Sequence, residues 1–258
     1  MYKGNNTIDN LSNALEYLNL SNNILTGCVN MQQYARQFAR LNVLDLHSNR
    51  LIEGIIFDDF ESDFPLPNLT YVDLSGNWLH GNFTLRQIPP RLEYLDISIN
   101  RFTQLHILGD DNSVLKYLYL HDNVFNITSP FSSFLQQLEH FPLLEVVTFD
   151  RSHVQENVST VILPPKLQIL SGSDNALRGR LNLSILPSTL EYLDLSGNEL
   201  TEVILEGVSG EEGKLKVLSL SNNKLYRTSF LDHLKSFPKL ETLQLSENEL
   251  NGSVPWAQ

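Results

Sequence analysis

Residues 190–200 read LEYLDLSGNEL, and residues 92–102, far upstream, read LEYLDISINRF, which is nearly the same string. Aligned on LxxLxLxxNxL, the chain contains ten such copies, and successive copies begin 23 to 29 residues apart. They begin at Leu15, Leu41, Leu69, Leu92, Leu115, Leu144, Leu167, Leu190, Leu215 and Leu240. One copy is too short to bury its own apolar positions, so the pattern predicts units that stack on one another.

The spacing inside a copy predicts a short strand. Leu193 and Leu195 are two residues apart, so a strand directs both to one face, while Tyr192 and Asp194 point to the other. Stacking such strands about 4.8 Å apart makes a parallel sheet over a continuous apolar core. Parallel neighbours require a crossover, and the 12–18 residues between copies are long enough to form it.

Nine copies hold Asn at the same position, where the chain turns inside the stack. We predict that these amides are structural, because they carry donors and an acceptor for backbone groups shielded from water. The residues of this asparagine ladder are Asn23, Asn49, Asn77, Asn100, Asn123, Asn175, Asn198, Asn223 and Asn248.

These repeats resemble the leucine-rich repeat family, whose periods run from about 20 to 29 residues. The resemblance covers nearly the whole chain and implies an α/β repeat solenoid: a right-handed, curved array of about ten repeats with a parallel sheet on its concave face. The convex face is expected to mix short helices with extended segments. MQQYARQFARL, FSSFLQQLEHF and FLDHLKSFPKL have helical spacing, whereas NFTLRQIPPRL and TVILPPKL carry adjacent prolines.

After the Asn, several copies continue as Leu-x-Gly-x-apolar, as in LTGCV (25–29), LHGNF (79–83), LRGRL (177–181) and LNGSV (250–254). This is similar to the class typical of plant receptor ectodomains and of secreted or surface proteins in protists and bacteria, although periods of 26–29 depart from its usual length. Nine Asn-x-Ser/Thr sequons favour a secreted or cell-surface glycoprotein; a subunit of an intracellular complex is the alternative. The sequons are Asn5, Asn10, Asn19, Asn68, Asn82, Asn126, Asn157, Asn182 and Asn251.

Composition limits the partners. The net charge is −12, from 18 basic and 30 acidic residues, so we expect no nucleic acid partner and no direct membrane insertion. A protein or peptide, basic or neutral, fits better. Cys28 is the single cysteine and is expected to be a small buried side chain. We expect one domain over 1–258, with a lead-in over 1–14, no C-terminal cap, and end-to-end or assembly contacts at uncapped termini.

No catalytic or cofactor motif is present: HExxH, GxSxG, a phosphate-binding glycine loop and paired cysteines are all absent. We therefore expect no enzyme activity, no cofactor and no metal site, and a catalytic role would need a further domain outside these residues. Three stacked carboxylates are a candidate Ca²⁺ site, but solvated carboxylates are the stronger expectation.

What remains for function is the outward face of the strands. Tyr side chains recur at its first position and Asp side chains at its second, which suits a peptide or protein carrying Lys or Arg. Tyr and Asp also recur in the family because they suit exposed strand positions, and that interpretation stays open. The candidate ligand-binding residues are Tyr71, Tyr94, Tyr117, Tyr119, Tyr192, Asp45, Asp73, Asp96 and Asp194.

The sixth and seventh repeats depart most from the pattern. Ser152 replaces the ladder Asn, Phe149 replaces the third Leu, and Gly172 removes that core side chain in the next repeat. One interpretation is that Phe149 fills the space that Gly172 leaves. The other is a local bend that presents a contact patch of Asp150, Arg151, Ser173 and Asp174.

Two functions follow from these features. The first is a recognition module that binds a protein or peptide on its concave face. The alternative is a structural or scaffolding subunit, in which the solenoid is a rigid part of a larger assembly.

Overall fold

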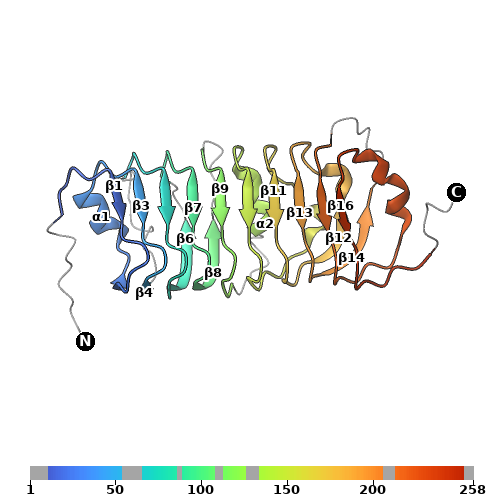
Figure 1. The fold of residues 1–258 in the computed structure, drawn as a ribbon, viewed down its shortest axis with the longest axis horizontal. Coiled ribbons are helices and arrows are strands. Elements are labelled where there is room, and N and C mark those ends of the chain that lie inside the picture. Colours follow the sequence, from blue (N-terminus) through green and yellow to red (C-terminus); the bar gives the residue numbers. More distant parts are fainter. Residues whose placement is uncertain are drawn as a thin grey trace.

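A computed structural model of the chain describes residues 11–53, 66–85, 89–107, 113–125, 134–205 and 213–252. Ten strands form one parallel sheet that runs from one end of the molecule to the other (Figure 1). They are β1 Tyr17–Asn19, β3 Val43–Asp45, β5 Tyr71–Asp73, β7 Tyr94–Asp96, β9 Tyr117–Tyr119, β10 Val146–Thr148, β11 Ile169–Ser171, β13 Tyr192–Asp194, β15 Val217–Ser219 and β16 Thr242–Gln244. The predicted fold class is confirmed: the chain is a curved α/β solenoid with this sheet on its concave face.

Each strand comes from one copy of the repeat, and equivalent positions pair across the sheet. Tyr71 pairs with Tyr94, and Asp73 pairs with Asp96. The strands are three residues long because the chain turns directly afterwards. In all ten copies the residue before the ladder position has a positive φ; Gly76 and Gly197 occupy two of these positions, and Ile99 another.

Three smaller parallel sheets follow the main one on the same turns, which the sequence predicted only as extended segments. They pair β2 Thr26–Cys28 with β4 Arg50–Glu53, β6 His80–Leu85 with β8 Arg101–Ile107, and β12 Arg178–Asn182 with β14 Glu199–Ile204. In each pair the register shifts directly after the glycine of Leu-x-Gly. Gly81 has a φ of +87°, a conformation that side chains rarely adopt.

Helices lie in the three crossovers with helical spacing. These are α1 Met31–Gln37, α2 Phe134–Gln137 continued by η2 Leu138–His140, and η5 Ser229–Ser236, which is a 3₁₀ helix rather than an α-helix. Two more 3₁₀ turns, η3 Val158–Thr160 and η4 Leu183–Ile185, begin after Asn157 and Asn182, whose side chains accept the N–H of Ser159 and Ser184. No helix in the described part of the chain is long and apolar enough to cross a membrane.

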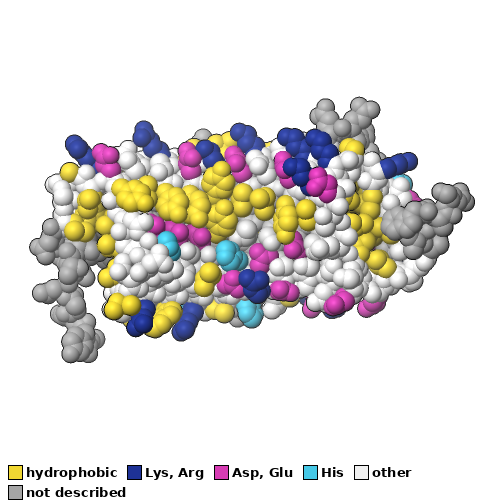
Figure 2. All heavy atoms as spheres, in the orientation of Figure 1, with side chains coloured by type: hydrophobic (Ala, Val, Ile, Leu, Met, Phe, Trp, Pro, Cys, Tyr) yellow, Lys and Arg dark blue, Asp and Glu magenta, His cyan; other side chains and the backbone are white. Residues whose placement is uncertain are grey.

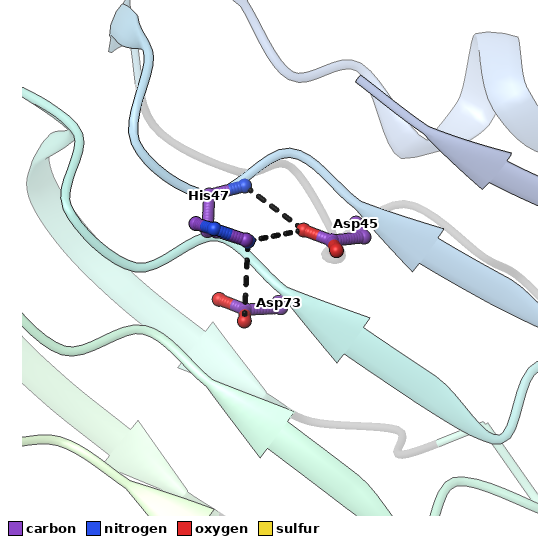
Figure 3. A group of neighbouring side chains, drawn as sticks. All are labelled: Asp45, His47 and Asp73. Atoms are coloured by element: carbon purple, nitrogen blue, oxygen red, sulfur yellow. Dashed lines mark hydrogen bonds and ion pairs between the residues drawn. The ribbon is translucent and has the colours of Figure 1, made fainter. Parts of the chain in front are cut away.

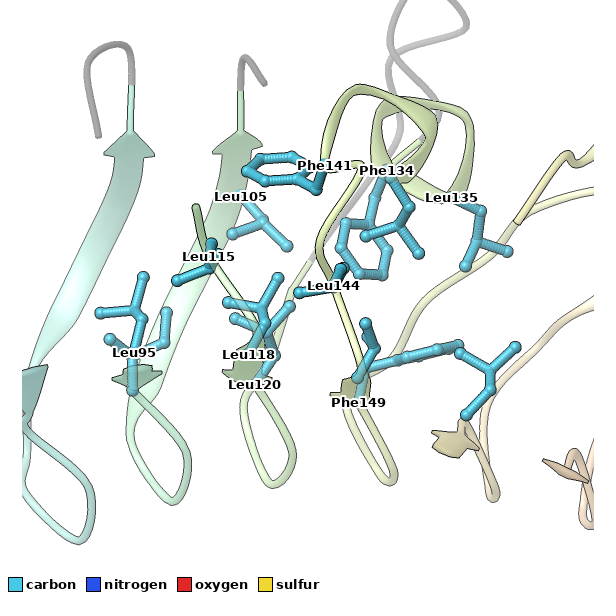
Figure 4. Packing of buried hydrophobic residues seen from close by; sticks show 14 of the residues in the cluster. Leu95, Leu105, Leu115, Leu118, Leu120, Phe134, Leu135, Phe141, Leu144 and Phe149 are labelled. Carbon is cyan, nitrogen blue, oxygen red and sulfur yellow. The ribbon is translucent and has the colours of Figure 1, made fainter. Parts of the chain in front are cut away.

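The core is a single band of Leu, Val and Phe side chains between the sheet and the crossovers (Figure 4). Phe149 is fully buried and meets the edge of Phe134 from α2 at a centroid distance of 5.4 Å. A buried carboxylate fixes the start of that helix, because Glu156 accepts the N–H of Phe134 at 2.6 Å and that of Leu135 at 3.1 Å. Cys28, expected to be buried, is exposed.

Candidate binding face on the concave sheet

A row of tyrosines crosses the middle of the concave face. The parallel register aligns Tyr71, Tyr94 and Tyr117 on β5, β7 and β9. The rings of Tyr71 and Tyr94 stack at 4.3 Å with an interplanar angle of 11°. Tyr119 tilts against Tyr94 at 5.3 Å. Figure 2 shows a hydrophobic band that crosses this face. Four of the five sequence-predicted tyrosines form one continuous surface, whereas Tyr192 lies apart on β13, where its neighbours in the register are Ile169 and Val217.

The aspartates beside this row close the ends of their strands. Asp96 Oδ1 accepts the backbone N–H of Ser98 at 2.8 Å and its hydroxyl at 2.6 Å. Asp73 and Asp194 bond in the same way to the serines that follow them. The remaining oxygen, Oδ2, accepts a longer bond of 3.3–3.4 Å from the tyrosine two residues earlier on the same strand. Tyr-x-Asp-x-Ser is thus a local bonding unit that repeats along the face.

These carboxylates are less accessible than the sequence pattern suggests. Asp45, Asp73 and Asp96 are only 7%, 8% and 9% exposed, while Asp194 is half-buried. Burial raises the pKa of the Asp96 carboxyl, and the Ser98 hydrogen bonds oppose that rise. Three mostly buried carboxylates therefore lie on the neighbouring strands β3, β5 and β7, beside the tyrosine row.

The hydroxyls of Tyr71, Tyr94, Tyr119 and Tyr192 stay protonated at neutral pH. Burial and the nearby Asp73 charge raise the pKa of Tyr71 to about 12. Burial, followed by the charge of Asp96, raises the pKa of Tyr94 further. The pKa values of Tyr119 and Tyr192 are raised as well, mainly by burial. These hydroxyls can therefore act as donors to a ligand.

The Asp45 end of the row carries a histidine, which the sequence reasoning did not single out. His47 lies where most other copies hold Ser, and its Nδ1 lies 2.7 Å from Asp45 Oδ1 and 3.7 Å from Asp73 Oδ2 (Figure 3). Its Nε2 lies 2.9 Å from the Asn22 amide nitrogen. Because that amide nitrogen can only donate, Nε2 accepts and the proton lies on Nδ1. The signal in the sequence was LDLHSN in place of LDLSGN.

The described ranges contain one group of three potential metal ligands: the ligand atoms of Asp45, His47 and Asp73 lie within 4.8 Å of one another. A divalent cation held there would displace the Nδ1 proton and break the bond to Asp45. The expectation of no metal site therefore stays a prediction.

The asparagine ladder connects successive coils. Asn100 Nδ2 donates to the carbonyls of Ile97 and Ser98 in its own turn and of Leu74 in the preceding coil, at 2.9–3.1 Å. Its Oδ1 accepts the N–H of Leu79 at 3.1 Å. The same pattern recurs, with small variations, at Asn49, Asn77, Asn123, Asn175, Asn198, Asn223 and Asn248. Asn23, in the first repeat, donates to its own turn.

Ser152 satisfies the ladder differently. Its hydroxyl lies 3.1 Å from the carbonyls of both Leu120 and Asp150. The N–H of Phe125, which would meet an Asn oxygen, donates to the Ser152 carbonyl at 3.1 Å instead. The sixth repeat therefore keeps the connection without the amide.

Six of the nine sequons fall in the described ranges. Asn82, Asn157 and Asn251 are exposed, and Asn68 and Asn182 are half-buried. Asn19 is exposed on the concave sheet, where its Nδ2 donates to Asp45 Oδ2 at 2.8 Å, so a glycan there would compete with that bond. Asn5, Asn10 and Asn126 lie outside the described residues.

Comparisons with known proteins agree with this architecture. A leucine-rich repeat family model matches residues 189–210 and 214–237. Cuscuta receptor 1 of Solanum lycopersicum is 30% identical over 74% of this chain and 19% of its own length. A protein phosphatase 1 regulatory inhibitor subunit homolog of Arabidopsis thaliana is 29% identical over 69% of this chain and 52% of its own. Podocan-like protein 1 of Mus musculus is 28% identical over 95% and 46%.

The chain thus spans about half, or less, of the length of these relatives. Among solved structures, the crystal structure of a TDR receptor superposes with a TM-score of 0.73 at 23% identity, covering 94% of this chain and 41% of that one. The repeats, the asparagine ladder, the concave sheet and the matching family model together establish that the chain belongs to the leucine-rich repeat proteins.

Proposed function

We propose that this solenoid is a non-catalytic recognition module that binds a peptide or protein segment carrying Lys or Arg on its concave face. The single observation behind the proposal is the continuous row of Tyr71, Tyr94, Tyr117 and Tyr119 over the buried carboxylates Asp45, Asp73 and Asp96. Stacked tyrosines offer a large, rigid contact area at low entropy cost. A cationic side chain that passes along the edge of the row would reach the carboxylates.

Charge supports a cationic ligand. In the described ranges, the Lys and Arg ion pairs involve other carboxylates, such as Lys116 with Glu93 and Arg151 with Asp122. Histidines are the nearby basic groups of the three central aspartates: His47 lies beside Asp45 and Asp73, and His121 acts on Asp96. A ligand ammonium or guanidinium would therefore compensate buried charge, and the long Tyr–Oδ2 bonds at Asp73 and Asp96 leave that oxygen able to accept it.

We further propose that the chain is part of a cell-surface or secreted protein. Its similarity to Cuscuta receptor 1 and to podocan-like protein 1 supports this location. The fold also occurs in HAESA, a receptor kinase solved with the peptide hormone IDA, at a TM-score of 0.62. The similarity to a phosphatase regulatory subunit favours the alternative, an intracellular scaffolding role.

Peptide selection tests the binding proposal without a known ligand. A random twelve-residue phage library is selected on the folded protein, and the recovered peptides are measured by fluorescence anisotropy. We expect enrichment of peptides with Lys or Arg. Replacing Tyr71, Tyr94 and Tyr117 by Ala should weaken them by roughly tenfold or more, as loss of an aromatic hot spot does.

Tyr226→Ala provides a matched control, because Tyr226 is exposed beside Arg227, away from the concave row. Selected peptides that bind the triple variant as tightly as the wild type would disprove the concave site. Peptides without a preference for Lys or Arg would disprove the cationic ligand while leaving the aromatic row as the contact.

A further inference from the structure

A second exposed surface lies along one edge of the solenoid, at the residue that directly follows the ladder Asn. In the first five repeats this position forms an edge strip of Ile24, Arg50, Trp78, Arg101 and Val124. Figure 2 shows hydrophobic and basic side chains alternating along the lower edge of the N-terminal half. In the other five repeats the same position holds His153, Ala176, Glu199, Lys224 and Glu249. The large apolar side chains and the arginines of this position are therefore confined to one half of the edge.

Main-chain hydrogen bonds connect the coils along the strip. The N–H of Trp78 donates to the Leu51 carbonyl at 2.9 Å, and that of Arg101 donates to the Leu79 carbonyl at 2.7 Å. The strand register places Arg101 opposite His80 rather than opposite Trp78, so the spacing of the strip follows from its side chains. The Cζ atoms of Arg50 and Arg101 each lie 5.9 Å from the Trp78 ring centroid, so they are separated by at most twice that distance, about 12 Å.

Trp78 lies between the two arginines. The Cζ atoms of Arg50 and Arg101 are each 5.9 Å from its ring centroid, one from the repeat before it and one from the repeat after. Trp78 is nevertheless 45% exposed, and Ile24 is 74% exposed. Since guanidinium groups flank the ring on both sides, its outer edge is what a partner can contact. Flat stacking of a sugar on the ring is thereby disfavoured.

A strained residue adjoins the strip. Ile99, in the same turn as Arg101, has a φ of +54° and a largely exposed side chain. A β-branched residue in this region is an outlier that costs about 1–3 kcal/mol, and the equivalent turn positions hold Gly, Asn, Asp, Ser, Arg or Glu. Neither burial nor backbone preference explains an isoleucine here, whereas a partner that covers it does.

The charge of the strip identifies the kind of partner. The chain carries a net charge of −12. Neither Arg50 nor Arg101 forms an ion pair with a described carboxylate, whereas Lys224, at the same position in the ninth repeat, pairs with Glu199 at 3.2 Å. Two guanidinium groups held rigidly beside exposed apolar side chains complement carboxylates that alternate with apolar residues.

We propose that the edge strip binds an extended acidic segment of a partner protein whose carboxylates are three residues apart. In a polyproline II conformation, residues i and i+3 lie on one side and are about 9.3 Å apart, which is within the reach of the two guanidinium groups beside Trp78. Apolar residues between them cover Trp78 and Ile99. This surface prefers the opposite charge from the concave face and does not depend on the function proposed for that face.

A designed peptide tests the spacing. Fluorescein-labelled (Glu-Pro-Leu)₄ is titrated with the protein and followed by anisotropy, alongside Glu₄-(Pro-Leu)₄, which has the same composition but clustered glutamates, and (Lys-Pro-Leu)₄. We expect the regularly spaced acidic peptide to bind at least fivefold more tightly than both. Arg50→Gln and Arg101→Gln should each weaken it two- to fivefold, as the loss of an exposed ion pair does.

Lys224→Gln is the matched control, because it removes the same charge from the same strip position and should change the affinity little. Ile99→Asn should weaken binding about threefold through the lost apolar contact. Because this change also relaxes the turn, the loss of affinity cannot be attributed to unfolding. Absence of binding, equal binding of the clustered or lysine peptide, or unchanged affinity in both arginine variants would overturn the proposal. Concentration-dependent dimerisation in light scattering that Arg101→Gln abolishes would assign the strip to a second copy of this chain instead.

Discussion

Replacing Gly172 by Ala should destabilise the solenoid, although this glycine needs no special backbone conformation. A Cβ at residue 172 would lie 2.5 Å from Cε2 and 2.9 Å from Cε1 of Phe149, and closer still to Cζ. Real Cβ atoms do not approach so closely, so the ring must move. Phe149 is fully buried against Phe134 and borders an apolar cavity of about 40 Å³.

The sign of the change in unfolding free energy shows whether the space beside Gly172 is free or is filled by Phe149. Where a glycine has ordinary dihedral angles and free space, substitution by Ala stabilises a protein by about 0.4–1 kcal/mol through the unfolded state. Overpacking a filled core costs about 1–3 kcal/mol. Since the clash is with a buried ring, we expect Gly172→Ala to lower the free energy of unfolding by about 1–3 kcal/mol.

A double-mutant cycle makes the test specific to this pair. Phe149→Leu alone leaves a cavity and should cost about 1–2 kcal/mol. Phe149→Leu combined with Gly172→Leu restores the leucine found at this position in most repeats, and should be more stable than the two single changes predict by at least about 1 kcal/mol. Urea unfolding followed by circular dichroism measures each variant. Additive effects, or a more stable Gly172→Ala, would refute the reciprocal packing.

Four further outcomes are expected from urea unfolding of single variants. Asn100→Ala should cost about 1–3 kcal/mol because it leaves buried backbone groups unpaired, whereas Asn23→Ala, in the exposed first repeat, should cost less than about 1 kcal/mol. Glu156→Ala should cost about 1–3 kcal/mol through the two uncapped N–H groups of α2, and hydrogen exchange should quicken at that helix. Ile99→Asn should stabilise by about 1 kcal/mol, because Asn tolerates the positive φ; an unchanged midpoint would argue against strain. The pKa of Asp96 is raised in the folded state, so the stability that this carboxyl confers falls as pH rises from 3.8 through its pKa in the folded protein. Asp96→Asn should therefore stabilise the protein at pH 7 and have no such effect at pH 3.

Most of the scaffold follows from the sequence because its physics is periodic. The spacing of Leu193 and Leu195 predicts the strand, and the recurrence of the copies predicts the parallel sheet and its register. The packing of Phe149 into the space left by Gly172 could also be inferred from the sequence, because a large and a small residue at one position in adjacent coils must compensate. The sequence did not predict the smaller sheets, because their pairing depends on a register shift after each Leu-x-Gly glycine. It also missed the 3₁₀ form of η5, since its apolar spacing resembles that of an α-helix.

The accessibility of the site could not be predicted, for a physical reason. Alternation along a strand assigns Asp73 and Asp96 to the outer face, but it says nothing about what covers that face. The neighbouring tyrosines and the serine two residues on surround each carboxylate, so a position that alternates outward becomes more than nine-tenths buried. Edge positions carry even less signal, because only the stacking of three repeats brings Arg50, Trp78 and Arg101 together.

The two oxygens of each aspartate have different roles: Oδ1 is structural, and Oδ2 is the oxygen that we propose for ligand binding. Oδ1 closes the strand through the following serine in repeats three, four and eight, and any leucine-rich repeat with LDLS can make that bond. The capacity of Oδ2 to accept a ligand depends on its neighbours. A short hydrogen bond would use that capacity, but the observed bond from the tyrosine hydroxyl is long, at 3.3–3.4 Å. Repeats three and four stack their tyrosines at 4.3 Å, whereas the neighbours of Tyr192 in the register are Ile169 and Val217. Identical motif letters therefore produce a shared aromatic surface only where adjacent coils repeat them, and that favours β5, β7 and β9 over β13 for the proposed binding face.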